Sequence, residues 1–182
     1  MGIKTIANGS HTAQAIYYKG VREIMDQIVI KQLEFVRQIT INAVKEMSEE
    51  TLDIIPEGFN NNVRWNLGHI YLIQEIFAFH FSGEPVQIPE NFKRLFAKGT
   101  KPADWNEEPP TLEVLLELLT EQPKRIQESL HNRLAEQVKT PFTTGSGITL
   151  STIGEFLNFS IYHEGMHYNT INILKRFADK SL

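Results

Sequence analysis

Four long stretches of this 182-residue chain carry apolar side chains at intervals of three and four residues. They cover residues 21–47, 62–82, 111–138 and 152–178. This spacing places the apolar side chains on one face of an α-helix, where they can pack against other helices. No stretch shows a clear strand alternation, and the chain has no internal repeat. The pattern therefore predicts an all-α chain built from four main helices.

The apolar stripes indicate which face of each helix meets the core. In the first helix the stripe is interrupted only by the polar Gln32. Thr111, and Thr152 together with Glu155, have the spacing of N-terminal caps on the third and fourth helices. Pro123 is expected to kink or split the third helix, because proline lacks the amide hydrogen that a helix interior needs. The first stripe consists of Val21, Met25, Ile28, Phe35, Ile39, Ala43 and Met47.

The links between the helices are unequal in length, with the second, residues 83–110, about twice as long as the others. It also holds five of the eight prolines. A long link allows two consecutive helices to lie parallel instead of antiparallel. The expected fold is therefore a four-helix bundle with one long crossover connection between helices 2 and 3.

Composition limits both the organisation and the function of the chain. The length corresponds to about one domain, which we expect to cover residues 20–182 after a flexible leader at residues 1–19. The absence of cysteine excludes disulfides, thiolate metal sites and catalysis by a protein thiol. A net charge of −4 argues against a nucleic-acid partner. The sequence has no run of 18 apolar residues, so no membrane span is predicted, and the expected location is the cytoplasm.

Charges are segregated along the long link. Residues 91–101 hold four bases and no acid, and residues 102–122 hold six acids and no base. A solvated loop that leads into a solvated helix face explains this pattern. The alternative is a basic loop that grips an anionic ligand. The four bases are Lys93, Arg94, Lys98 and Lys101.

Two histidines, His163 and His167, are four residues apart on the apolar stripe of the last helix. This spacing corresponds to about 40° of rotation and about 6 Å of rise, so both rings project toward one point. Imidazoles that face a core need polar partners, which either a metal ion or hydrogen bonds can provide. A shared metal ion is a common reason for this spacing.

A metal site needs at least one more ligand from another helix. His69 lies on the apolar stripe of the second helix, beside the small Gly68 and the polar Asn66. His80 lies near the same face but about 16 Å further along the axis, so the two cannot share one ion. His69 is therefore the preferred third ligand. The alternative is a purely structural role, in which all three histidines are hydrogen-bonded core residues.

The segment from His163 to His167 also spells HExxH, the signature of zinc peptidases. In that interpretation Glu164 is a general base. The chain has no glutamate after His167 and no third histidine at the spacing of the extended signature, so we rank this alternative low. Glu164 remains the candidate catalytic residue, either as a base or by orienting an imidazole, with a surface acid as the alternative.

Two motifs, Trp65-Asn66-Leu67-Gly68-His69 and the segment His163–His167, resemble those of the DinB/YfiT-like family of metalloenzymes. The resemblance covers most of the chain. It implies a four-helix bundle with a crossover and a divalent metal, zinc or nickel in many members, held by His69, His163 and His167. Iron(II) also accepts three imidazole ligands. The resemblance also implies a small-molecule substrate and a homodimer. Family members include S-transferases that use a low-molecular-weight thiol such as bacillithiol, and hydrolases.

Three neutral imidazoles leave open coordination positions, which is typical of a catalytic metal site. A metal-bound thiol loses its proton outright, and a metal-bound water has a pKa of about 7. The first hypothesis is therefore a metal-dependent transferase with a low-molecular-weight thiol as cosubstrate. The second is a metal-dependent hydrolase. The third is a metal-binding bundle without catalytic activity.

Overall fold

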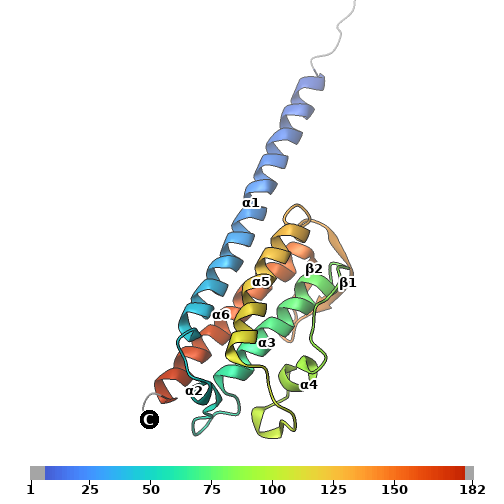
Figure 1. Cartoon of the computed structure of the whole chain (residues 1–182). Coiled ribbons are helices and arrows are strands. Elements are labelled where there is room, and N and C mark those ends of the chain that lie inside the picture. The colour runs from blue at the N-terminus through green and yellow to red at the C-terminus, as the bar shows by residue number, and fades with distance from the viewer. Residues whose placement is uncertain (1–6, 179–182) are drawn as a thin grey trace, which may run out of the picture.

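A computed structural model describes residues 7–178 and shows the expected four long helices (Figure 1). They are α1 (Ala7–Val44), α3 (Val63–Glu75), α5 (Leu112–Leu130) and α6 (Ile153–Ala178). A π-helical turn, η1 (Ile76–His80), continues α3. Within residues 7–178 no helix combines the length and the apolar composition that crossing a bilayer requires.

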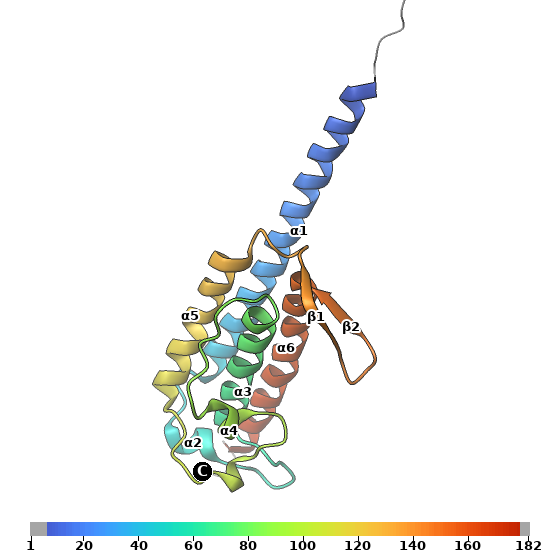
Figure 2. The ribbon, with the colours of Figure 1, turned by 90° about the vertical axis from the view of Figure 1, so that its right-hand side faces the viewer.

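The crossover topology is confirmed. In Figures 1 and 2, α1 and α6 run in one direction and α3 and α5 in the other. Each of α1 and α3 packs against both α5 and α6. The parallel pair α3 and α5 requires the chain to return along the bundle, which the link at residues 83–110 does. Three short helices lie in the connections: α2 (Glu49–Asp53), α4 (Phe92–Phe96) and the 3-10 turn η2 (Pro102–Asp104).

The third helix is shorter than predicted, and a hairpin follows it. The helix ends at Leu130 rather than near Val138, and the chain then forms the antiparallel strands β1 (Gln137–Thr143) and β2 (Thr149–Thr152). The strand signal was missed because most β1 side chains are exposed and show no alternation. The predicted caps are confirmed: the hydroxyl of Thr111 accepts from the Val114 amide, and Thr152 and Glu155 bond reciprocally.

Two expectations for the first helix were wrong. The helix begins at Ala7, so residues 7–19, expected as a flexible leader, are helical; residues 1–6 lie outside the described part of the chain. The predicted core stripe also lies largely on the outer side, where Phe35 is 60% exposed. The face that meets the bundle carries polar as well as apolar residues, and this mixture hid it from the periodicity. It consists of Ile30, Leu33, Val36, Arg37, Thr40 and Val44.

The core consists of two apolar clusters. One is formed around Tyr71, Leu119 and Ile171, and the other around Phe77 and Leu157. On each helix, buried polar residues fall between the positions that contribute to the two clusters. These residues are Arg37 of α1, Glu75 of α3, Gln122 of α5 and Glu164 of α6. They form a polar layer across the bundle.

Hydrogen bonds connect every member of the polar layer. Arg37 donates to both carboxylate oxygens of Glu164, at 2.9 and 3.0 Å, and to the side-chain oxygen of Gln122 at 3.2 Å. Gln122 in turn donates to Glu75 at 2.8 Å. Buried charges are tolerated only when they are paired and hydrogen-bonded in this way. The layer therefore ties all four helices together.

Pro123 leaves one backbone carbonyl of α5 without its helical hydrogen bond, and Arg37 uses that carbonyl. The proline lies inside α5 without splitting it, and it has no amide hydrogen to donate to the carbonyl of Leu119, four residues earlier. The guanidinium of Arg37 donates to that carbonyl at 2.7 Å. The proline thus leaves an acceptor for the arginine.

Replacing Arg37 with methionine should destabilise the protein by about 3–5 kcal/mol, because it leaves a buried carboxylate and a buried carbonyl without donors. The measurement is urea unfolding of the metal-free protein. The double variant R37M/E164M should recover part of this loss, since it removes the unpaired charge as well. A loss below about 1 kcal/mol in R37M would contradict a structural role for the pair.

Candidate metal centre

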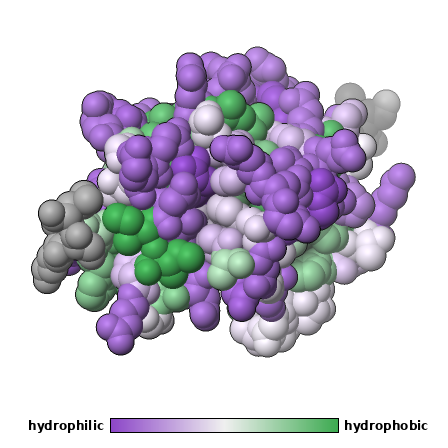
Figure 3. Space-filling model, turned by 60° about the horizontal axis from the view of Figure 1, so that its bottom comes forward, coloured by the Kyte–Doolittle hydropathy of each residue, from purple (hydrophilic) through white to green (hydrophobic). Residues whose placement is uncertain are grey.

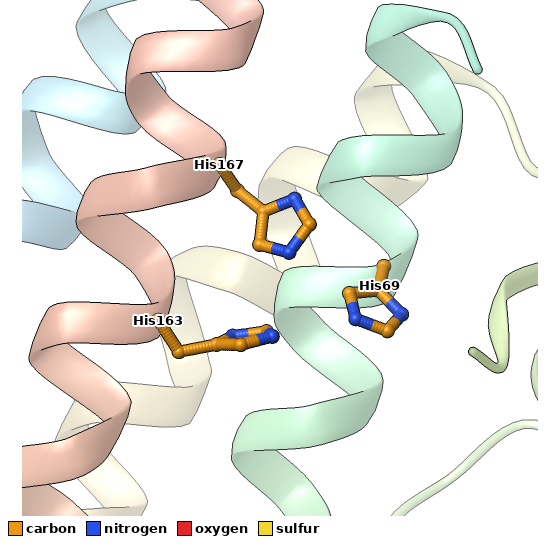
Figure 4. A group of neighbouring side chains, drawn as sticks. All are labelled: His69, His163 and His167. Atoms are coloured by element: carbon orange, nitrogen blue, oxygen red, sulfur yellow. The ribbon is translucent and has the colours of Figure 1, made fainter. Parts of the chain in front are cut away.

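The structure brings together the three histidines that the sequence singled out. His163 and His167 extend from α6 and His69 from α3, and the three rings point toward one another (Figure 4). One ring nitrogen from each residue lies within 4.8 Å of those of the other two. The ring centroids are 4.6–5.2 Å apart. Within the described chain this group contains no carboxylate.

The rotation of α6 about its axis decides where its histidines point. Glu164 lies about 100° around the helix from His163, and its carboxylate is held in the polar layer by Arg37. With Glu164 directed at α1, the two histidines on the neighbouring face are directed at α3. The ion pair and the histidine pair are therefore two consequences of one helix orientation.

His69 is oriented by the crossover link. Its Nδ1 lies 2.6 Å from the backbone carbonyl of Phe96 in α4. Because a carbonyl only accepts, Nδ1 must carry the proton, and Nε2 keeps its lone pair for a metal. Gly68 makes this approach possible: a Cβ at this position would lie 2.5 Å from the ring of Phe96.

His167 is oriented by a chain of asparagine side chains. Its Nδ1 lies 2.7 Å from Oδ1 of Asn66, whose own amide nitrogen donates to the carbonyl of Asn62 at 2.7 Å. That second bond fixes which way the Asn66 amide faces, so the histidine must donate from Nδ1. Asn62 is itself the N-cap of α3 and accepts from the Trp65 amide at 2.8 Å. Nε2 of His167 is again left free.

Trp65 holds the outer side of the centre. Its ring stacks on that of His69, with centroids 4.6 Å apart and planes 12° apart. Its indole nitrogen donates to the hydroxyl of Thr100 at 2.9 Å. The tryptophan thus connects a candidate ligand to the turn that follows α4. Each polar or small residue of the Trp65–His69 motif now has a physical role.

Burial lowers the pKa of all three imidazoles, chiefly by desolvation of the charged form. The pKa of His163 falls to about 4 with a further contribution from His69, and that of His167 to about 3 with contributions from His163 and His69. The carbonyl of Phe96 opposes part of the decrease at His69. All three rings are therefore uncharged at neutral pH, which is the form that binds a metal ion.

This donor set fits a divalent transition metal. Nitrogens bound tetrahedrally at about 2.0–2.1 Å from one zinc ion are about 3.3 Å apart. The present separations, up to 4.8 Å, exceed that value by at most about 1.5 Å. Histidine ligands are usually neutral, and the ring nitrogen that does not bind the metal usually donates a hydrogen bond, here to a carbonyl or to a side-chain amide oxygen. Imidazole suits zinc, nickel and iron alike.

Glu164, the predicted catalytic residue, has surroundings that do not suit a base. It is buried, which excludes the surface alternative, and both of its carboxylate oxygens accept from Arg37. The ion pair instead joins α6 to α1. His80, set aside as a ligand, is exposed at the end of η1. Sequence reasoning missed Arg37, because it lies on the face of α1 that the periodicity did not identify. The one available signal was Pro123, which inside a helix leaves the carbonyl four residues earlier without its usual donor.

Two pockets flank the centre on either side of Trp65. One, of about 430 Å³, reaches His167 and is lined by uncharged residues. The other, of about 420 Å³, reaches His69. Asn60, Asn61 and Trp65 line both pockets. His69 and His167 are thus each reached by a separate pocket.

The fold and the site define a four-helix bundle with a candidate three-histidine metal centre. A sequence profile of the DinB superfamily matches residues 32–171, which include all three histidines. The chain belongs to the DinB superfamily. The crystal structure of a conserved protein from Enterococcus faecalis is similar, with a TM-score of 0.60 over 85% of this chain and 96% of that chain at 14% identity. That likeness concerns the fold alone. No curated protein matches the chain.

Replacing Asn66 with alanine should weaken zinc binding by about 10–100-fold, because His167 loses the acceptor that orients its ring. The dissociation constant is measured by competition with a chromophoric chelator, after circular dichroism has shown that the variant is folded. Asn158, which is exposed on the same helix as His167, is the matched control, and N158A should bind zinc as the wild type does. An unchanged affinity in N66A would remove its positioning role.

Proposed function

We propose that the protein is a metal-dependent enzyme whose ion is held by His69, His163 and His167. The observation that carries the proposal is the convergence of three neutral imidazoles, two of them with Nδ1 bonded so that Nε2 is free. Within the described chain no fourth protein ligand joins the group, so coordination positions stay open to a substrate.

The favoured reaction is transfer of a low-molecular-weight thiol to an electrophile. When bound, the metal supplies a Lewis acid that lowers the pKa of a coordinated thiol below neutral pH. No protein base is then needed. A metal-bound water, with a pKa of about 7, is only about half ionised at neutral pH. Hydrolysis therefore gains more from a protein base, and the carboxylate nearest in sequence, Glu164, is occupied by Arg37. This difference favours the transferase over the hydrolase.

The purified protein should contain about one divalent metal ion per chain, and H163A should lose it, because two imidazoles bind too weakly. Elemental analysis measures both, with H131A, an exposed histidine elsewhere, as the control. The metal-loaded protein should consume 1-chloro-2,4-dinitrobenzene only when a thiol such as 2-mercaptoethanol is present. Turnover of esters without thiol would indicate the hydrolase. Equal metal content in the wild type and H163A would overturn the metal centre.

A second copy of the chain is the partner that we propose for the outer face of α1. Figure 1 shows α1 extending beyond the other helices. Its exposed apolar residues are separated by four, three, four and seven residues, a spacing that keeps them on one face as in paired helices, with exposures from 39 to 68%. With neighbouring Tyr18 and Met25 they present on the order of 800 Å², which matches one side of a standard interface. The face consists of Tyr17, Val21, Ile24, Ile28 and Phe35.

The double variant I24E/I28E should therefore be monomeric where the wild type is a dimer, because buried unpaired carboxylates oppose association. Multi-angle light scattering after size-exclusion chromatography measures the mass. I148E, at a similarly exposed isoleucine in the hairpin loop, should remain dimeric. A monomeric wild type would contradict the proposal, and so would a dimer that survives both substitutions on α1.

A further inference from the structure

The pocket beside His69 is the only one of the two flanking pockets that carries formal charge. Lys98 and Lys101 line it, and none of its lining residues is acidic. Of the four bases in the link, Arg94 is neutralised by Glu107, at 2.8 and 3.1 Å, and does not line the pocket. Lys98 has no ion pair within the described chain, and Lys101 has only a loose one with Asp104 at 3.6 Å. Two cationic groups therefore remain available beside a candidate metal ligand.

The turn that carries these lysines is fixed relative to the metal centre. Gly99 has a φ of 92°, and the Thr100 amide donates to the carbonyl of Ala97, as in a type II turn. The Thr100 hydroxyl donates to the backbone of the same segment and accepts from the indole of Trp65. Since Trp65 stacks on His69, the lysines and the metal ligand belong to one connected unit.

A third group in this pocket lacks a partner. The Oδ1 atom of Asn61 is buried and makes no hydrogen bond within the described structure. An unsatisfied buried acceptor costs about 1–3 kcal/mol, which a ligand that donates an N–H or O–H recovers. Asn61 lines this pocket together with the lysines, and it also borders the neutral pocket at His167. A ligand that matches this pocket carries an anionic group for the lysines and a hydrogen-bond donor for Asn61.

We infer that the pocket formed by Lys98, Lys101 and Asn61 binds the carboxylate end of the thiol substrate. The inference rests on the proposed function and names its substrate class: a carboxylate-bearing thiol that also offers a hydroxyl or amide donor. The lysines hold the carboxylate while the sulfur reaches the metal held by the histidines. Figure 3 shows that this end of the bundle is largely hydrophilic, which suits a charged ligand. The basic segment of the link thus acts on a ligand instead of serving as a solvated loop.

The test measures binding and does not depend on turnover. Cobalt-loaded protein is titrated with mercaptosuccinate, a dicarboxylate, and with neutral 1-thioglycerol, and thiolate coordination is followed by the ultraviolet absorption of the cobalt–thiolate bond. The wild type should bind mercaptosuccinate more tightly than 1-thioglycerol, and this preference is the ratio of the 1-thioglycerol to the mercaptosuccinate dissociation constant. In K98Q/K101Q the ratio should fall about tenfold, and 0.5 M salt should reduce it similarly in the wild type. Lys93 is exposed on the same link but does not line the pocket, and K93Q should keep the wild-type ratio.

The outcomes separate this inference from the proposed function. Coordination of both thiols with a ratio that the lysine substitutions leave unchanged would overturn the carboxylate pocket and leave the thiol chemistry intact. If neither thiol coordinates the metal, the thiol function fails. The pocket is then tested without a thiol, by titrating succinate while the amide NMR signals of Gly99 and Thr100 are followed. Saturable shifts that K98Q/K101Q abolishes, and K93Q does not, would keep the pocket as a carboxylate site. Their absence would overturn it.

Discussion

The buried ion pair between Arg37 and Glu164 is the interaction on which the arrangement of the bundle depends. Glu164 lies between the two histidines of α6, and pairing it with α1 sets the rotation that turns both rings toward α3. The polar layer also fixes how far the helices are shifted along their axes relative to one another. Apolar clusters lie on both sides of it, and packing between them alone would tolerate a shift of one helical turn, whereas a buried carboxylate without its guanidinium would not. The layer therefore specifies the position of the three histidines more than it adds to stability.

The crossover link does more than connect two parallel helices. It contributes a backbone carbonyl to His69, and Gly68 is the residue that lets the link come close enough to do so. A few residues later the same segment places Thr100 on Trp65 and two lysines at the edge of the pocket. Displacement of this segment would therefore disturb the tautomer of a candidate ligand and the shape of the binding pocket together. The segment is anchored to the bundle by its own apolar side chains as well, because Phe92, Leu95 and Phe96 belong to one of the two core clusters.

Much of this architecture could be predicted from the sequence, for identifiable reasons. Helical periodicity and one long link were sufficient for the crossover bundle, and the spacing of His163 and His167 was sufficient to place both rings on one face. The outward stripe of α1 was misassigned because periodicity gives the existence of an apolar face but not its direction, and Arg37 and Thr40 make the true core face look polar. The carbonyl of Phe96 was beyond prediction, since a backbone acceptor carries no residue signature. The pairing of Glu164 with Arg37 was not foreseen, because sequence neighbours on a helix point in different directions.

The two pockets that meet at Trp65 differ in a way that bears on the reaction. They have nearly equal volumes and share three lining residues, but the one at His69 carries two lysines and the one at His167 carries no charge. A hydrolase with one organic substrate has no need of two such different approaches to its metal. A transfer reaction has two organic substrates with different polarity, and it must bring them to adjacent positions without competition. In the proposed reaction, an anionic thiol on the cationic side and an uncharged electrophile on the neutral side would approach His69 and His167 respectively. The asymmetry of the pockets therefore supports a two-substrate reaction independently of the identity of the metal.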